Sequence, residues 1–187
     1  EHWSFTAQGI LSQGWSVMIP SYPQAPDVKI TQITHSISKL VYKILDDCNG
    51  SIRMIGHSAG GHLASRMICK NFLKKNMGKH IDKVISVSGL YDLRPLLMTK
   101  LNDILKLDYE EAERESCFLY DPIDTKLTCW VGANERPEFL RQNRILTEAW
   151  SKKSRNIESY YDPGKDHFSV IDQLEEKESL LTQSITK

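Results

Sequence analysis

A serine between two glycines is the first feature of this sequence that could do chemistry. It fits the pattern G-x-S-x-G, in which a nucleophilic serine sits on a sharp turn between a strand and a helix: Gly56-His57-Ser58-Ala59-Gly60. An apolar run at residues 51–55 precedes the motif, and a helical pattern follows it. A glycine-rich turn without chemistry is the alternative, but this setting favours Ser58 as a nucleophile.

The same turn predicts how negative charge would be stabilised. A helix that begins at Ala59 presents unpaired N–H groups and a partial positive charge to the reacting oxygen. We expect the Ala59 N–H to be one donor of an oxyanion hole. Gly56 and Gly60 are expected to lack side chains so that the helix can pack against the strand.

A serine hydroxyl is a poor nucleophile until a base removes its proton. His167 is the candidate base, because it lies in a loop directly after the last apolar run, residues 157–161. His80 lies in a polar run that is typical of an exposed helix end. His57 and His62 flank the serine, and we expect structural roles for both, one filling the turn and the other lying along the helix.

The base needs a carboxylate that accepts a hydrogen bond from it and stabilises its charged form. With this serine turn the chain order is serine, acid, histidine, so the acid should come from the loop at residues 132–137. Glu135 is the only carboxylate in that loop, since Glu138 already belongs to the next helix. Asp166 and Asp162 are the rivals, although sequence neighbours of a histidine rarely point at its ring.

Composition excludes several classes of function. The 187 residues carry 24 Lys and Arg against 24 Asp and Glu, so the formal net charge is zero. This balance gives no electrostatic footprint for nucleic acid or for an anionic membrane. The apolar runs are too short to span a bilayer, and no secretory signal is visible.

The cysteines indicate a reducing compartment. They are widely spread, with no C-x-x-C pair and no histidine pairs at the spacing of metal ligands: Cys48, Cys69, Cys117 and Cys129. We expect reduced thiols that pack as small apolar groups, as is usual in the cytosol. No metal or organic cofactor is expected.

Short β-rich runs alternate with helical patterns along the chain. The predicted strands cover residues 15–19, 51–55, 83–87, 127–131 and 157–161. The predicted helices cover residues 3–11, 30–45, 59–75 and 137–152, with short helical pieces at 90–120 and 168–184. This alternation predicts an α/β fold, in which helices cover both faces of a mostly parallel sheet. Residues 1–187 read as a single domain.

Four segments together resemble one family. They are residues 56–63 (GHSAGGHL), 88–96 (SGLYDLRPL), 131–142 (VGANERPEFLRQ) and 166–168 (DHF). The first and last are shared with many esterases, whereas the two middle segments are much more specific. On these segments the chain resembles the kynurenine formamidase (arylformamidase) family of α/β-hydrolase-fold serine hydrolases.

The resemblance implies hydrolysis of N-formyl-L-kynurenine to kynurenine and formate, a step in tryptophan breakdown. Carried onto this sequence, it implies Ser58 as nucleophile, Glu135 as acid and His167 as base. The family usually has Asp where this chain has Glu135. An aromatic wall would hold the substrate, and Tyr22, Tyr91 and Trp15 are candidates for it, although packing would explain each of them as well.

The family also carries a His-Gly-Gly-x-Trp motif that supplies the second oxyanion donor, and this sequence does not contain it. We therefore expect the domain to be N-terminally incomplete, without its first strands and without that donor. The missing strand would lie between the strands predicted at residues 15–19 and 51–55, and both would lose backbone partners.

Two other functions stay open. One is a carboxylesterase that acts on short acyl esters, because it would use the same three residues. The other is a catalytically inactive hydrolase-fold protein that binds a ligand. The expected partner is a small-molecule substrate. The sequence does not define the oligomeric state, and a homodimer is one option.

Overall fold

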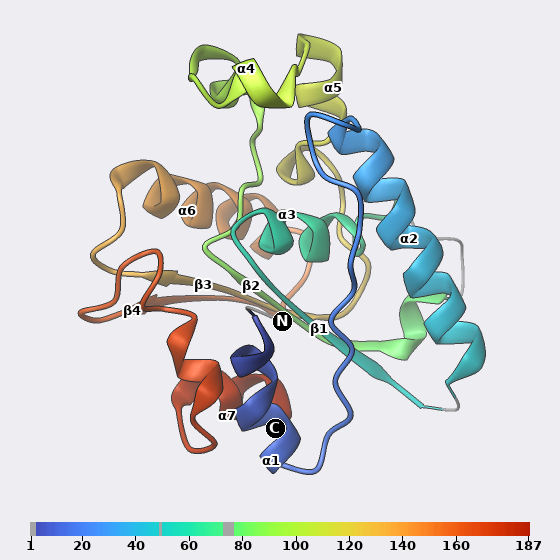
Figure 1. Cartoon of the computed structure of the whole chain (residues 1–187), viewed down its shortest axis with the longest axis vertical. Coiled ribbons are helices and arrows are strands. Elements are labelled where there is room, and N and C mark those ends of the chain that lie inside the picture. The colour runs from blue at the N-terminus through green and yellow to red at the C-terminus, as the bar shows by residue number, and fades with distance from the viewer. Residues whose placement is uncertain (1–2, 49, 73–76) are drawn as a thin grey trace.

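One parallel sheet organises the chain (Figure 1). The computed structural model describes residues 3–48, 50–72 and 77–187. The strands lie side by side in the order in which they occur in the sequence, and each pairs with the next in parallel: β1 (Ile52–His57), β2 (Ile81–Val87), β3 (Lys126–Gly132) and β4 (Ile157–Asp162). The predicted strands at 51–55, 83–87, 127–131 and 157–161 are therefore confirmed.

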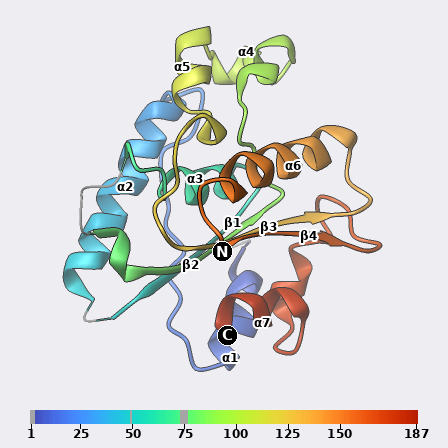
Figure 2. The same ribbon diagram turned by 180° about the vertical axis from the view of Figure 1, so that it is seen from behind.

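Helices cover both faces of this sheet (Figures 1 and 2). On one face lie α2 (Ile30–Asp47), α3 (Ala59–Arg66) and α6 (Pro137–Ser151), and on the other lie α1 (Gln8–Ser12) and α7 (Leu180–Thr186). The remaining helices are α4 (Asn102–Leu105) and α5 (Tyr109–Arg114), with single 3-10 turns η1 (Ser4–Ala7), η2 (Met77–His80), η3 (Arg94–Met98), η4 (Cys117–Leu119) and η5 (Asp172–Glu175). The predicted α/β architecture is confirmed.

The side chains of each strand point alternately to the two faces of the sheet, and this divides the apolar core into two parts. In β2, Val84 belongs to the apolar cluster under α2, α3 and α6, whereas Ile85 and Val87 belong to the cluster under α1 and α7. This follows because successive side chains of a strand point to opposite faces of the sheet. Trp150 of α6 is fully buried in the first cluster, and Leu181 of α7 is fully buried in the second.

The helix predicted at residues 59–75 is too long, because α3 ends at Arg66. The chain then turns toward residues 121–123. The N–H of Lys70 donates to the carbonyl of Asp121 (2.8 Å), and the N–H of Ile123 donates to the carbonyl of Ile68 (2.8 Å). The apolar residues that suggested more helix are buried beside this contact instead. Residues 73–76 of the prediction lie outside the described residues.

The strand predicted at residues 15–19 is wrong. The segment is extended but has no secondary structure, and within the described residues β1 pairs only with β2. Two of its apolar side chains, Trp15 and Val17, pack against the domain, whereas Met18 and Ile19 are exposed. Val17 joins the cluster under α1 and α7, and the Arg53 guanidinium lies 4.5 Å from the centre of the Trp15 ring.

The long middle segment forms short helices and loops, as predicted. The helices η3, α4 and α5 stand away from the sheet at the top of Figure 1. No described helix is both long enough and apolar enough to cross a membrane.

Candidate active site

Three strand ends bring the predicted site residues together. Ser58 directly follows β1, Glu135 lies in the loop after β3, and His167 lies in the loop after β4. Because the strands are parallel, their carboxyl ends meet at one edge of the sheet, where ligands of open α/β sheets commonly bind. The Nδ1 atom of His167 lies 2.7 Å from Oε2 of Glu135, and its Nε2 lies 3.2 Å from Oγ of Ser58.

The turn at the serine has an uncommon backbone. Ser58 has φ 54° and ψ −116°, a region that residues other than glycine seldom adopt. Its N–H donates to the carbonyl of Val87 (2.8 Å), which ties the turn to β2. The first hydrogen bond of α3 runs from the His62 N–H to the Ser58 carbonyl (3.1 Å). The N–H of Ala59, the first residue of α3, precedes that bond, which is the position expected for an oxyanion donor.

Two glycines of this turn, Gly56 and Gly61, allow close packing, whereas the sequence predicted this role for Gly56 and Gly60. A side chain at Gly56 would place its Cβ 2.1 Å from the carbonyl oxygen of Gly60. At Gly60 a Cβ would meet nothing within 4 Å, so the expectation for Gly60 is wrong. The close approach falls on Gly61, whose Cβ would lie 2.9 Å from the Cα of Gly89 on the neighbouring strand's loop.

The partners of His167 assign its protons. A carboxylate only accepts hydrogen bonds, so Nδ1 of His167 carries the proton and donates it to Glu135. Its Nε2 is then an acceptor, directed at the hydroxyl of Ser58. This is the arrangement in which an imidazole can take a proton from a serine.

Glu135 is held as a buried carboxylate, and its side chain is fully covered. Burial on its own raises the pKa of Glu135. Hydrogen bonds from His167, from the Ser88 hydroxyl and from the Gly132 N–H outweigh that effect and hold the pKa below its ordinary value. The group is therefore negative at neutral pH and can stabilise a positive charge on His167.

His57 and Phe139 hold the imidazole of His167 in place. The Nε2–H of His57 donates to the carbonyl of His167 (2.7 Å), and the two ring centres are 4.7 Å apart. Burial and the neighbouring histidine lower the pKa of His57, so it stays neutral. The Phe139 ring centre lies 4.2 Å from that of His167. Sequence reasoning missed the role of Phe139, although its place in the first turn after the Glu135 loop was a usable signal.

The other histidines stand apart from this chemistry. His62 is buried, and its Nε2–H donates to the carbonyl of Glu115 (2.8 Å), which confirms a structural role. His80 is exposed at the end of η2, as predicted.

The two rival carboxylates also have other partners. Asp166 accepts from the N–H groups of Phe168 (3.0 Å) and Ser169 (2.8 Å) in its own loop. Asp162 accepts from the indole N–H of Trp130 (3.0 Å). Of the three candidate acids, Glu135 is the one that contacts the His167 ring.

The predicted aromatic wall is partly wrong. Tyr91 is completely buried in the core, and its hydroxyl donates to Oγ of Ser86 (2.7 Å), so no part of it is accessible to a substrate. Trp15 contacts Arg53, near the amino end of β1, whereas Ser58 follows the carboxyl end. Tyr22 is half-buried, and its role in binding stays a prediction.

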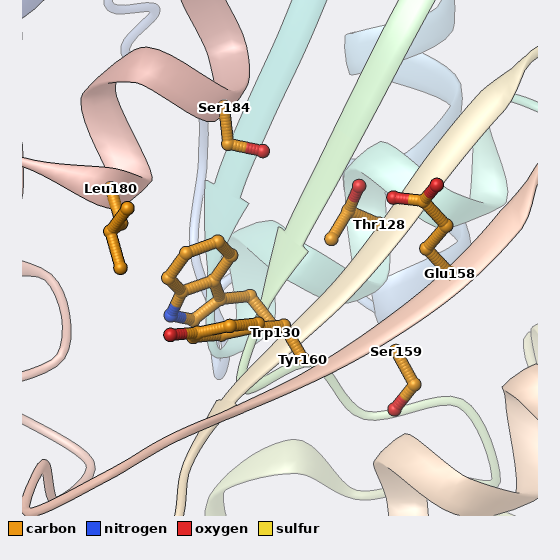
Figure 3. Close-up of a pocket in the computed structure, with 7 residues that line it drawn as sticks. All are labelled: Thr128, Trp130, Glu158, Ser159, Tyr160, Leu180 and Ser184. Carbon is orange, nitrogen blue, oxygen red and sulfur yellow. The ribbon is translucent and has the colours of Figure 1, made fainter.

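A cavity of about 270 Å³ lies elsewhere, between α7 and the strands β3 and β4 (Figure 3). Trp130 and Tyr160 form part of its wall, with ring centres 4.0 Å apart. None of its lining residues belongs to the Ser58 site: Thr128, Trp130, Glu158, Ser159, Tyr160, Leu180 and Ser184. Among the described residues there is no group of three or more His, Cys, Asp or Glu side chains that could hold a metal ion.

Comparison with known proteins places this site in context. No family model matches the chain. Kynurenine formamidase of Danio rerio is 29% identical over 194 residues, covering 98% of this chain, and that of Salmo salar is 29% identical over 198 residues, covering all of it. The Drosophila melanogaster kynurenine formamidase is 25% identical over 178 residues. The chain spans 65%, 67% and 59% of the length of these three proteins.

Solved structures agree on the fold. A protein from Silicibacter sp. TM1040, described as a candidate thioesterase, is 42% identical and superposes with a TM-score of 0.91. The match covers 99% of this chain and 69% of that one. An esterase from Pyrobaculum calidifontis is 16% identical and has a TM-score of 0.74, covering 97% of this chain and 69% of its own.

The parallel sheet and these structural neighbours define the chain as an α/β-hydrolase fold. Several esterases share that fold with it at low sequence identity. Within this class the chain is similar over most of its length to curated kynurenine formamidases.

Proposed function

We propose that this chain provides the catalytic residues of a serine hydrolase that cleaves N-formyl-L-kynurenine to kynurenine and formate. One observation carries the proposal: the ring of His167 lies between the hydroxyl of Ser58 and the carboxylate of Glu135. The similarity to kynurenine formamidases supports the choice of substrate.

The geometry supports an acyl-transfer mechanism. Ser58 Oγ attacks the formyl carbon while Nε2 of His167 takes the hydroxyl proton, and Glu135 stabilises the imidazolium that forms. The Ala59 N–H stabilises the oxyanion. When the C–N bond breaks, His167 gives its proton to the aniline nitrogen, and kynurenine leaves.

A formyl ester on Ser58 remains after this step. Water then attacks the formyl carbon while His167 takes a proton from it. The ester bond breaks, the proton returns to Ser58 Oγ, and formate is released. No cofactor is needed for either half of the reaction.

Thioester hydrolysis is a second candidate, because the protein that is 42% identical is described as a candidate thioesterase. Ester cleavage, the alternative predicted from sequence, would use the same three residues. We also propose a small-molecule substrate as the partner and the cytosol as the compartment. The cysteines support the latter, since all four are free thiols.

The test is an assay of the purified protein against N-formyl-L-kynurenine, a short-chain aryl ester and a short acyl thioester. We expect formate release from the first substrate to be fastest. Ser58→Ala should reduce it by about a million-fold, since the serine and histidine act as a unit. Ser58 should also be labelled covalently by a fluorophosphonate.

Other outcomes would replace the proposal. Preferential cleavage of the thioester or the ester would assign the corresponding alternative. Activity that survives Ser58→Ala would contradict the mechanism, and the absence of both turnover and labelling would favour a binding protein.

A further inference from the structure

Ser88 is a second serine with an uncommon backbone. It directly follows β2, it is buried to 2% exposure, and its φ is 51°. Residues other than glycine rarely adopt this conformation. The chain nevertheless has serine at this position, and its glycine, Gly89, is the residue that follows. The chain therefore keeps a side chain at the position where a glycine would be the easier choice, which indicates that the side chain is used.

The hydroxyl of Ser88 donates a hydrogen bond to Oε1 of Glu135. The N–H of Gly132 donates to the same oxygen (3.0 Å). The other oxygen, Oε2, accepts from Nδ1 of His167 (2.7 Å). Two donors thus fix one oxygen of the carboxylate, and the second oxygen is left for the imidazole.

A glutamate needs such support more than an aspartate does. Its side chain has one more rotatable bond, so more freedom must be lost to hold the carboxylate in one orientation. The strand that leads into the Glu135 loop, β3, supplies the Gly132 N–H. Ser88 instead follows the neighbouring strand, and it connects the carboxylate to β2. The backbone of Ser88 is fixed in turn, because its N–H donates to the carbonyl of Trp130 (2.7 Å).

We propose that Ser88 is a positioning residue, whose hydroxyl holds Oε1 of Glu135 so that Oε2 stays directed at His167. This inference rests on the proposed function of the Ser58 site and adds a fourth side chain to it. Ser88 does not touch the substrate in this role. It acts through Glu135, and it allows a glutamate to serve as the acid.

The proposal has a pH signature. The Ser88 hydroxyl is one of the groups that lower the pKa of Glu135, so its loss should raise that pKa. The titratable groups facing Glu135 are His167, from the loop after β4, and His57, at the end of β1. Glu135 and His167 share a proton, so the acid limb of the kcat/KM profile reports the pair rather than either residue alone. A carboxylate that has lost the Ser88 donor attracts a proton to the pair more strongly, so the acid limb should move to higher pH.

Ser88→Gly is the sharpest variant, because glycine accepts a φ of 51° while the hydroxyl is lost. We expect kcat to fall by about 10- to 100-fold through misplacement of the acid and base, with KM unchanged. Ser88→Ala should show the same defect with the strained backbone kept. In a Glu135→Gln background, Ser88→Gly should have little further effect on kcat, since both act through one interaction.

Ser116→Ala is the matched control. Ser116 is also fully buried, and its hydroxyl donates to the carbonyl of Ala112 (2.6 Å) and accepts from the Leu93 N–H (2.9 Å). Removing it should lower stability without moving the acid limb.

Proton NMR provides a readout that does not depend on turnover. The Nδ1–H proton of His167, shared with Glu135, should give a low-field signal that moves in both Ser88 variants and stays in place in Ser116→Ala. An unchanged signal and an unchanged acid limb in folded Ser88→Gly would overturn the positioning role. If the wild-type protein cleaved none of the three substrates, the proposed function would fail, and the NMR signal would still decide whether Ser88 orients Glu135.

Discussion

Two polar clusters in this molecule each contain a histidine and a glutamate, and they use them in opposite ways. The first, the triad cluster, consists of Ser58, Ser88, Glu135 and His167 at the carboxyl ends of the strands. The second, the ion-pair cluster, consists of His62 and Arg66 of α3 with Glu115, which follows α5.

The difference lies in what the carboxylate faces. In the triad cluster Glu135 accepts from His167 (2.7 Å). In the ion-pair cluster the Glu115 carboxylate faces the Arg66 guanidinium (3.3 Å), and the His62 ring donates to the main-chain carbonyl of Glu115 rather than to its carboxylate. A permanent cation balances the charge of Glu115, so its histidine stays uninvolved, whereas Glu135 remains available to stabilise a charge that comes and goes on His167.

The triad cluster is more exposed than the ion-pair cluster, and its backbone is more strained. The His167 side chain is 21% exposed, whereas those of Arg66 and Glu115 are 3% and 1% exposed. The triad cluster contains two serines with positive φ, and no member of the ion-pair cluster has one. Access and local strain therefore distinguish a cluster suited to chemistry from one that stabilises the fold.

The same substitution in each cluster gives the largest contrast. Glu135→Gln should reduce kcat by about 10,000-fold, because the imidazolium loses its counter-charge. Glu115→Gln should leave kcat intact but lower the free energy of unfolding by about 3–5 kcal/mol, because Arg66 is left buried without its counter-charge.

Turnover assays and urea unfolding of both variants would measure this contrast. A large loss of turnover in folded Glu115→Gln, or none in Glu135→Gln, would show that the two clusters are not functionally separate.

The aromatic residues beside each cluster offer a smaller contrast. Phe139→Ala should lower kcat by about tenfold, because the His167 ring loses its packing partner and can turn away from Ser58. Phe72 lies under the Arg66 guanidinium, 4.6 Å from its central carbon. Phe72→Ala should cost about 0.5–2 kcal/mol of stability and leave kcat unchanged. Equal kcat values for the two variants would argue against a role of Phe139 in holding the base.

Asp92 carries the smallest expected effect. Its carboxylate accepts from Arg94 (2.8 and 3.1 Å), and Arg141 lies 3.6 Å away. Burial alone raises the pKa of Asp92, but the hydrogen bonds and charge of Arg94, helped by Arg141, hold it below its ordinary value. A lowered pKa in the folded state means stabilisation that is complete above about pH 4 and is lost as the pH falls through the folded value.

Asp92→Asn should therefore lower the free energy of unfolding by about 1 kcal/mol at neutral pH and leave turnover unchanged. Denaturant unfolding at pH 7 and at pH 3 would measure this. The difference between wild type and variant should shrink at the lower pH, and a difference that grew there would contradict the ion pair.

Local patterns were enough to predict the three residues of the hydrogen-bonded chain and the parallel sheet. Ser58 is marked by its motif, and Glu135 and His167 by their positions after strands. Ser88 could not be found this way, because its role depends on β2 lying beside β3 and on a positive φ that no pattern encodes. Tyr91 was misassigned for a related reason, since an aromatic side chain reads the same whether it lines a pocket or fills a core.

Long-range contacts also explain the two wrong elements. Residues 15–19 form a short apolar run that suggested a strand, but only Trp15 and Val17 pack against the domain, and the segment does not join the ladder. The apolar pattern after Arg66 continues a helical period, but the backbone there pairs with residues 121–123. In both places a tertiary contact outweighed the local preference.

The sequential parallel order of the sheet has a kinetic consequence. The two residues that exchange the proton are 109 positions apart, and each neighbouring pair of strands is joined by a crossover rather than by a tight turn. Chains with a high contact order fold slowly. Distant segments must first come together, which costs chain entropy, before their contacts can stabilise the fold. The fourth strand delivers His167, so a chain with three strands in place has a nucleophile but no base. Catalytic competence should therefore be among the last properties that a newly made molecule acquires, and partly folded molecules should be chemically inert.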